Sequence, residues 1–151
     1  MNKPPPLRPS LLKRKIVAKP WGGRALERVL GLTLDPDEQV GETWEVFDRP
    51  EGSSRMLADG RTLAEWMATG GQDLLGRGIK PAPGNRFPLL LKFIDAREAL
   101  SVQVHPDDEL ARPEGDCGKN EAWVILDVGP QARIIRGVLA STTRERFAAV
   151  A

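Results

Sequence analysis

The sequence predicts an all-β protein built on an antiparallel β-sandwich or barrel, with a few short helices. Four extended segments lie close together in the second half of the chain, and the connections between them are short. No long helical pattern separates them, as alternating β and α units would require. The chain has 151 residues, enough for one domain with one sizeable core.

The first part of the chain divides into a lead-in and a region of short strands. Residues 1–15 are rich in proline and carry the basic run Lys13-Arg14-Lys15, and we expect this lead-in to be disordered. The domain is then expected to begin at residue 16. Between Ile16 and Leu34, short apolar groups alternate with Lys19-Pro20-Trp21-Gly22-Gly23, where two glycines permit a tight turn. The pattern predicts short strands around a tight loop.

The middle of the chain predicts one strand, one helix and one long loop. Val40 to Phe47 is rich in β-branched and aromatic residues and reads as a strand. A helix is expected from Thr62 to Ala68, because Thr62 and Glu65 resemble a capping box, and to end at Gly70-Gly71. Glycines and prolines between residues 76 and 86 predict a loop.

The second half predicts two pairs of strands and a terminal helix. The strands are expected at Phe87 to Ile94, Ala99 to His105, Glu121 to Val128 and Ala132 to Val138. Thr142, with Glu145 three residues later, predicts a helix start. The apolar face of that helix has just begun where the sequence stops, so we expect a truncated chain.

Composition excludes several classes of protein. The formal net charge is +1, which supplies no field to concentrate nucleic acid. No apolar stretch is long enough to cross a membrane, and no secretory signal is recognisable. The single cysteine, Cys117, excludes an intrachain disulfide. These features predict a cytoplasmic protein without nucleic-acid or membrane partners.

The expected strand that ends at His105 carries the first candidate site residues. Side chains alternate along a strand, so Ser101, Gln103 and His105 project from one face. An amide oxygen and an imidazole at this spacing could reach one cation, and Glu121 could join them from a neighbouring strand. The alternative is a half-exposed strand with its polar face in water.

Two lysines could add positive charge to the polar face that carries Gln103 and His105. Lys119 shares a face with Glu121 in the next expected strand, which would place a cation beside the carboxylate. Alternatively, the two form a surface pair of little energetic value. Lys92 interrupts an apolar run, and a charged residue there needs a partner, an anion or solvent.

Five blocks of sequence together resemble the type I phosphomannose isomerases, in order and in spacing. They are Lys19-Pro20-Trp21-Gly22-Gly23, Gly41-Glu42-Thr43-Trp44-Glu45, Phe87-Pro88-Leu89-Leu90-Leu91-Lys92-Phe93-Ile94-Asp95-Ala96, Leu100-Ser101-Val102-Gln103-Val104-His105-Pro106-Asp107-Asp108 and Gly118-Lys119-Asn120-Glu121-Ala122-Trp123. The resemblance runs from about Ile16 to Val138. The fourth and fifth blocks, around His105 and Glu121, make the resemblance specific because they occur together.

The resemblance implies a zinc-dependent isomerase of the cupin superfamily that interconverts mannose 6-phosphate and fructose 6-phosphate through an enediol. Residues 16–151 would then be the N-terminal part of a cupin-type jelly-roll domain. The residues that match family positions are, for zinc, Gln103, His105 and Glu121; for the sugar phosphate, Trp21, Lys92 and Ser101; and, for catalysis, Lys119.

The sequence departs from the family in its downstream part. The family completes its metal site with a second histidine and adds a catalytic arginine, whereas the only histidine in this sequence is His105. We therefore expect this chain to bind zinc weakly and to turn over little on its own. The alternative is a non-catalytic, cupin-like module that binds sugar phosphates or oligomerises. Open strand edges in half a barrel would favour a homo-oligomer that covers them.

Overall fold

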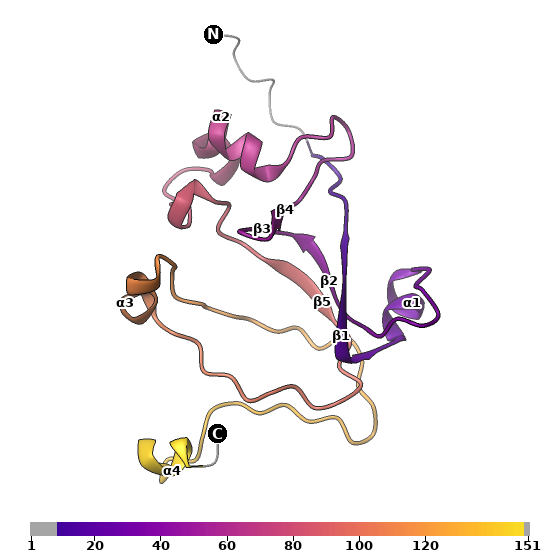
Figure 1. Ribbon diagram of the computed structural model, residues 1–151, viewed down its shortest axis with the longest axis vertical. Coiled ribbons are helices and arrows are strands. Elements are labelled where there is room, and N and C mark those ends of the chain that lie inside the picture. The colour runs from indigo at the N-terminus through magenta and orange to yellow at the C-terminus, as the bar shows by residue number, and fades with distance from the viewer. Residues whose placement is uncertain (1–8, 150–151) are drawn as a thin grey trace.

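A three-stranded antiparallel sheet forms the centre of the molecule, as Figure 1 shows. The structure is a computed structural model that describes residues 9–149. Its strand order is β1-β2-β5, and a two-stranded hairpin, β3-β4, continues from β2. The elements are β1 (Lys15–Gly23), α1 (Ala25–Leu30), β2 (Val40–Val46), β3 (Asp48–Arg49), β4 (Gly52–Ser53), α2 (Leu63–Leu75), η1 (Pro83–Asn85), β5 (Leu91–Ile94), α3 (Asp108–Ala111), η2 (Arg112–Glu114) and α4 (Arg144–Ala148).

Strand β2 lies in the centre of the sheet, and its prediction from β-branched and aromatic residues is confirmed. Thr43 pairs with Ile16 on one side and with Phe93 on the other. The first four residues of β2 are buried because neighbouring strands cover both of its edges and the strand packs on both faces. The central strand therefore positions the side chains of both β1 and β5.

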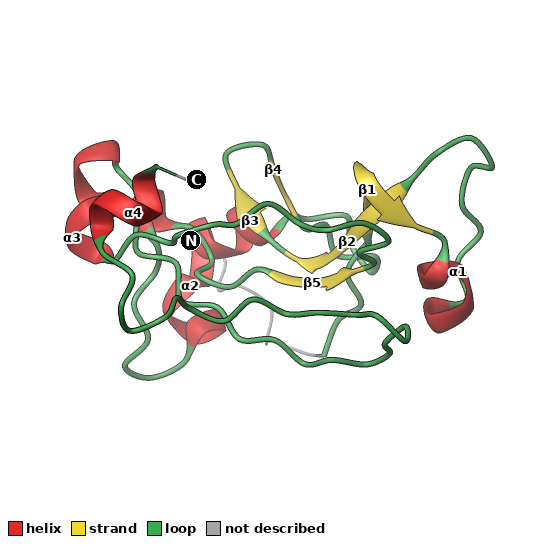
Figure 2. Ribbon diagram, turned by 90° about the horizontal axis from the view of Figure 1, so that it is seen from below, coloured by secondary structure: helices red, strands yellow, loops and turns green. Residues whose placement is uncertain are grey.

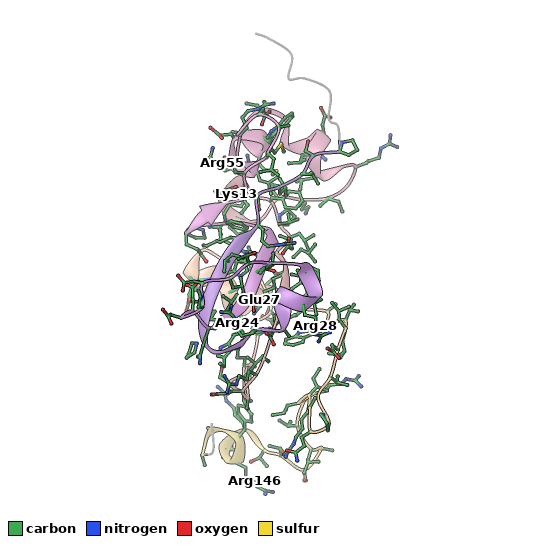
Figure 3. All side chains as sticks on the ribbon, turned by 90° about the vertical axis from the view of Figure 1, so that its right-hand side faces the viewer. Lys13, Arg24, Glu27, Arg28, Arg55 and Arg146 are labelled. Atoms are coloured by element: carbon green, nitrogen blue, oxygen red, sulfur yellow. The ribbon has the colours of Figure 1, made fainter. Side chains whose placement is uncertain are left out.

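The lead-in joins the fold before β1 begins. Leu12 bridges Met56, and the amide of Lys13 donates to the carbonyl of Arg55 at 2.7 Å. Figure 3 labels Lys13 and Arg55 beside each other. Leu12 packs against a buried cluster, so apolar burial holds the chain in place from here. Residues 1–8 of the expected lead-in lie outside the described residues.

The prediction of several short strands between Ile16 and Leu34 is wrong in part. One long strand, β1, is followed by helix α1 instead. The carboxylate of Asp95 accepts a hydrogen bond from the amide of Ala25 at 2.6 Å, which satisfies an amide at the helix start. Leu26 is buried against Val40, so tertiary packing selects the helix where the local sequence favoured turns.

Helix α2 confirms the capping box predicted at Thr62. The Thr62 hydroxyl accepts from the amide of Glu65, and the Glu65 carboxylate accepts from the amide of Thr62 at 2.7 Å. The helix continues to Leu75, beyond the expected end, although Gly70 departs from helical geometry. Leu63 and Trp66 bury one face of α2 in a cluster with Met56, and Leu74, beyond the glycines, packs against the same cluster.

Three of the four strands predicted in the second half do not form. Residues 99–105, 121–128 and 132–138 follow irregular paths, and β5 begins at Leu91 rather than at Phe87. A strand exists only when a neighbour pairs with its backbone, and sequence periodicity does not provide that neighbour. Figure 1 shows these segments, in the salmon-to-yellow part of the colour range, running below the sheet, and Figure 2 draws the irregular parts of the chain as green loops. The described residues therefore form open antiparallel sheets in place of the expected sandwich or barrel.

The terminal helix α4 forms one residue later than predicted. Its N-cap is Thr143, whose hydroxyl accepts from the amide of Arg146, and not Thr142. Both threonines offer the same hydroxyl, so the difference lies in the backbone and not in the chemistry of the cap. No helix within residues 9–149 is long and apolar enough to span a membrane.

Candidate metal and sugar-phosphate site

Two hydrogen bonds join residues 106–108 to residues 118–119 beside the candidate site, and we call this pair of bonds the clamp. The amide of Gly118 donates to the Asp108 carboxylate at 2.8 Å, and the amide of Lys119 donates to the Pro106 carbonyl at 3.1 Å. A Cβ at Gly118 would lie 2.7 Å from the amide nitrogen of Asp108, so only glycine fits this approach. Asp107 caps α3 by accepting from the amide of Leu110. The clamp sets His105 close to Glu121.

His105 and Glu121 are in direct contact. The distance between His105 Nε2 and Glu121 Oε2 is 3.1 Å, and the Lys119 ammonium lies 3.8 Å from Glu121 Oε1. The His105 and Glu121 side chains are 24% and 28% exposed, so solvent or a ligand can reach them. The structure thus brings together three of the site residues that the sequence predicts.

The carboxylate of Glu121 is ionised over the ordinary pH range. Partial burial is the largest influence on its pKa and raises it. The hydrogen bonds from Trp123 and His105 and the charge of Lys119 lower it, and together they hold the pKa below its usual value. An anionic oxygen therefore lies beside the imidazole nitrogen, a donor pair that divalent zinc accepts.

Lys92 finds the partner that its position in an apolar strand requires. Its ammonium donates to Glu42 Oε1 at 3.0 Å, while the indole of Trp44 donates to Glu42 Oε2 at 2.7 Å. The Glu42 side chain is 8% exposed and that of Lys92 is 21% exposed. Lys92 therefore presents part of its charge to solvent while a buried carboxylate holds its position.

Burial and hydrogen bonding compete at Glu42. Burial is the largest influence on the pKa of this carboxyl and raises it. The hydrogen bonds from Trp44 and Lys92, with the charges of Lys92 and Lys19, outweigh burial and lower the pKa. The Glu42 carboxylate is therefore ionised at neutral pH despite its burial.

The remaining predicted residues lie in other contacts. The Gln103 amide donates to the Ser101 hydroxyl at 3.1 Å. Trp21 lies on β1, where its ring packs on Gly41 and its carbonyl accepts from the amides of Arg97 and Glu98. Within residues 9–149, no three His, Cys, Asp or Glu side chains converge as a metal site. Two of the three predicted metal ligands are thus in contact, and Gln103 bonds to Ser101.

The sequence did not reveal the contacts of two residues that build the site, Glu42 and Asp108. The signal for Glu42 was the demand of Lys92 for a partner, but sequence does not say which carboxylate lies across the strand pair. The position of Asp108 after Pro106 indicated a turn-forming residue, and nothing in the sequence indicated that its carboxylate accepts a hydrogen bond from the amide of Gly118. Both roles depend on contacts between segments that are separated along the chain.

Comparison of the sequence with known proteins assigns this chain to a family. The sequence model described as phosphomannose isomerase type I, catalytic domain, matches residues 11–123. The chain belongs to the type I phosphomannose isomerase family. This match includes both segments of the clamp and every site residue that the sequence predicts.

Individual relatives agree with the phosphomannose isomerase family. The chain is 39% identical to the putative mannose-6-phosphate isomerase YvyI of Bacillus subtilis over 84% of this chain and 40% of the relative. Its identity to mannose-6-phosphate isomerase ManA of the same organism is 40%, over 83% of this chain and 39% of the relative. The chain therefore spans about two fifths of the length of these curated relatives.

Solved phosphomannose isomerase structures resemble this fold. The mannose 6-phosphate isomerase from Bacillus subtilis matches with a TM-score of 0.61 and 36% identity, over 73% of this chain and 35% of that one. A variant of the phosphomannose isomerase from Salmonella typhimurium matches with a TM-score of 0.52 and 26% identity, over 68% of this chain and 27% of that one. The open sheet thus corresponds to part of a larger family structure.

Proposed function

We propose that this chain supplies the metal-binding and phosphate-binding groups of a mannose-6-phosphate isomerase with a cupin-type jelly-roll fold. The observation that carries the proposal is the contact among His105, Glu121 and Lys119, which places two metal donors and a cation at one point. Family membership supports the reaction class, because the matching relatives are named as mannose-6-phosphate isomerases. The proposed reaction interconverts mannose 6-phosphate and fructose 6-phosphate.

The donor pair fits zinc in chemistry and in spacing. Two ligands of a tetrahedral zinc ion lie about 3.2 Å apart when each bond is about 2 Å long. His105 Nε2 and Glu121 Oε2 are 3.1 Å apart, so both could bind one ion after a small movement. Gln103 would offer a third donor through its amide oxygen. When bound, zinc would supply Lewis-acid polarisation of the sugar oxygens at the carbons that exchange a proton.

The side chains around the donor pair have separate proposed roles in stabilising charge, binding the phosphate and packing against the sugar. Lys119 is half-exposed and positively charged, so its ammonium can stabilise negative charge that develops on a substrate oxygen. The Lys92 ammonium and the Ser101 hydroxyl would bind the phosphate and fix the orientation of the sugar. Trp21 would pack against the sugar ring. Glu42 keeps the Lys92 ammonium in place through the 3.0 Å contact.

A second candidate function is a sugar-phosphate-binding module without turnover. The observation that favours it is the donor count, because the part of the chain that the structure describes brings two metal donors into contact and no cluster of three acidic, thiol or imidazole groups. A catalytic zinc site normally has three protein ligands. Both functions require binding of zinc and the sugar phosphate, but only the isomerase converts the sugar phosphate.

Binding and turnover measured separately decide between these functions. Calorimetry with mannose 6-phosphate, with and without zinc, would measure binding to the chain, and a coupled assay for fructose 6-phosphate would measure turnover. We expect zinc-dependent binding that Lys92→Met weakens and that the exposed control Lys80→Met leaves unchanged. Turnover abolished by a chelator would establish the isomerase, and binding without turnover would establish the module. Absence of binding in the presence of zinc would contradict both.

A further inference from the structure

Asp95 follows directly after β5 and joins three elements of the fold. Its carboxylate accepts a hydrogen bond from the amide of Ala25 at the start of α1, at 2.6 Å. Its own amide donates to the carbonyl of Gly41 in β2 at 2.8 Å. Figure 1 shows α1 beside the end of β1, where these bonds lie. Asp95 therefore connects β5 and β2 to the chain that follows β1.

The backbone of Trp21 is held by the residues that follow Asp95. The amides of Arg97 and Glu98 donate to the Trp21 carbonyl at 3.0 and 3.2 Å. The next residue of β1, Gly22, forms a bridge with the residue after Asp95. Hydrogen bonds to a backbone do not select the rotamer of the side chain, so packing must set where the Trp21 ring lies.

Close packing on three glycines sets the position of the ring. A Cβ at Gly41 would lie 2.6 Å from Trp21 Cζ3, so the ring packs directly against the backbone of β2. A Cβ at Gly22 would lie 2.4 Å from the amide nitrogen of Gly41. A Cβ at Gly23 would lie 2.8 Å from Asp95 Oδ2, well inside the contact distance of about 3.5–4.0 Å. Strand β2 thus covers Gly22, and the Asp95 carboxylate covers Gly23.

We propose, on the basis of the proposed function in which Trp21 packs against the sugar, that Asp95 is a positioning residue that fixes the Trp21 ring. The carboxylate acts through the turn after Trp21, because it bonds to Ala25 and packs on Gly23. Without it, the amide of Ala25 at the helix start loses its acceptor. The turn can then move away from β2, and the ring can leave Gly41.

This role affects the sugar and not the phosphate. The proposed phosphate ligands are Lys92 and Ser101, and a carboxylate repels an anion. Loss of the Asp95 charge should therefore not weaken the binding of phosphate, whereas displacement of the Trp21 ring should weaken the binding of the sugar. Asp95→Asn separates the two effects, because it removes the charge and keeps an oxygen that can accept from Ala25.

Fluorine NMR on the whole 151-residue chain tests the position of the ring without any ligand. With 5-fluorotryptophan in place of its four tryptophans, Trp21→Phe identifies the signal of Trp21. Asp95→Ala should shift or broaden that signal, and Asp95→Asn should restore it. The control Thr62→Ala also removes an acceptor at a helix start, that of α2, and should leave the Trp21 signal unchanged.

Calorimetry in the presence of zinc gives the second readout. Asp95→Ala should weaken the binding of mannose 6-phosphate at least about fivefold and should not weaken the binding of inorganic phosphate. Trp21→Ala should show the same selectivity. The double variant should bind mannose 6-phosphate no more weakly than Trp21→Ala alone, because Asp95 acts through the ring.

Several results would overturn the role of Asp95. An unchanged Trp21 signal in Asp95→Ala, or a signal that Asp95→Asn disturbs equally, would show that the hydrogen bond to Ala25 does not position the ring. Equal weakening of mannose 6-phosphate and phosphate, or additive effects of the two substitutions, would show a general structural role. If Asp95→Ala does not fold, Gly23→Ala applies the same test, because its Cβ would displace the carboxylate.

Failure of the proposed function is a separate outcome. Absence of mannose 6-phosphate binding by the wild-type chain in the presence of zinc would contradict the proposed function. The Trp21 signal of the chain without ligand would still decide whether Asp95 fixes the ring.

Discussion

Replacing Lys92 with methionine removes the charged partner of the buried Glu42 carboxylate. The variant keeps the length of the side chain but removes the ammonium that lies 3.0 Å from Glu42 Oε1. Glu42 would keep the hydrogen bond from Trp44 while its side chain remains 8% exposed. Removing one partner of a buried pair costs about 3–5 kcal/mol, and the partial exposure of Lys92 reduces this to about 2–3 kcal/mol.

The cost should depend on pH in a direction that the structure fixes. In the wild-type protein the lowered pKa of Glu42 stabilises the fold above the ordinary glutamate pKa of about 4.3, and this stabilisation is lost as the pH falls through the folded-state pKa. Without Lys92, burial raises the pKa, so the variant is penalised where the carboxylate is ionised. The difference between the proteins should be largest near pH 7 and should narrow as the pH falls through the raised pKa of the variant and then the lowered pKa of the wild type.

Chemical denaturation at pH 7 and at pH 4 measures the effect. Lys92→Met should lose about 2–3 kcal/mol at pH 7, and Glu42→Gln/Lys92→Met should recover part of that loss because no buried charge remains. The exposed control Lys80→Met should change stability by less than about 0.5 kcal/mol. A loss at Lys92 no greater than at Lys80, or strictly additive single and double variants, would refute the assignment of Glu42 and Lys92 as a coupled buried pair.

Two further substitutions test local features of the fold. Gly118→Ala would place a Cβ 2.7 Å from the amide nitrogen of Asp108, so it should open the clamp and lower zinc affinity at least about tenfold in calorimetry, whereas Gly129→Ala, where nothing lies within 4 Å, should not. Equal affinities would show that the clamp does not position the metal donors. Thr62→Ala removes the N-cap of α2 and should lower thermal stability by about 1 kcal/mol, while the exposed control Thr33→Ala should have a smaller effect. Indistinguishable melting temperatures would show that the cap contributes nothing.

Local chemistry made part of this fold predictable from sequence. The capping box at Thr62 depends on residues within one turn, and β2 combines β-branched residues with a regular alternation, so both were predicted correctly. Strand pairing depends on a neighbour that the local sequence does not contain. For that reason residues 121–128 have the composition of a strand without forming one.

The candidate site shows the same division. Motif blocks indicated His105, Glu121 and Lys119, and the structure brings them into contact. The need of Lys92 for a partner was also visible in the sequence, but the identity of Glu42 required the register between β2 and β5. Residue type therefore predicted which groups carry charge. Strand pairing determined that Lys92 meets Glu42, and the clamp determined that His105 meets Glu121.

Zinc titration of the chain by calorimetry tests the central claim most directly, since it asks whether His105 and Glu121 hold a metal. We expect weak binding of one zinc ion, with affinity reduced at least about tenfold by His105→Ala and by Glu121→Gln. Glu109→Gln, an exposed carboxylate on α3, should bind zinc as the wild-type chain does. Zinc affinity that is the same in all four proteins, or the absence of zinc binding by the wild-type chain, would show that His105 and Glu121 are not metal ligands.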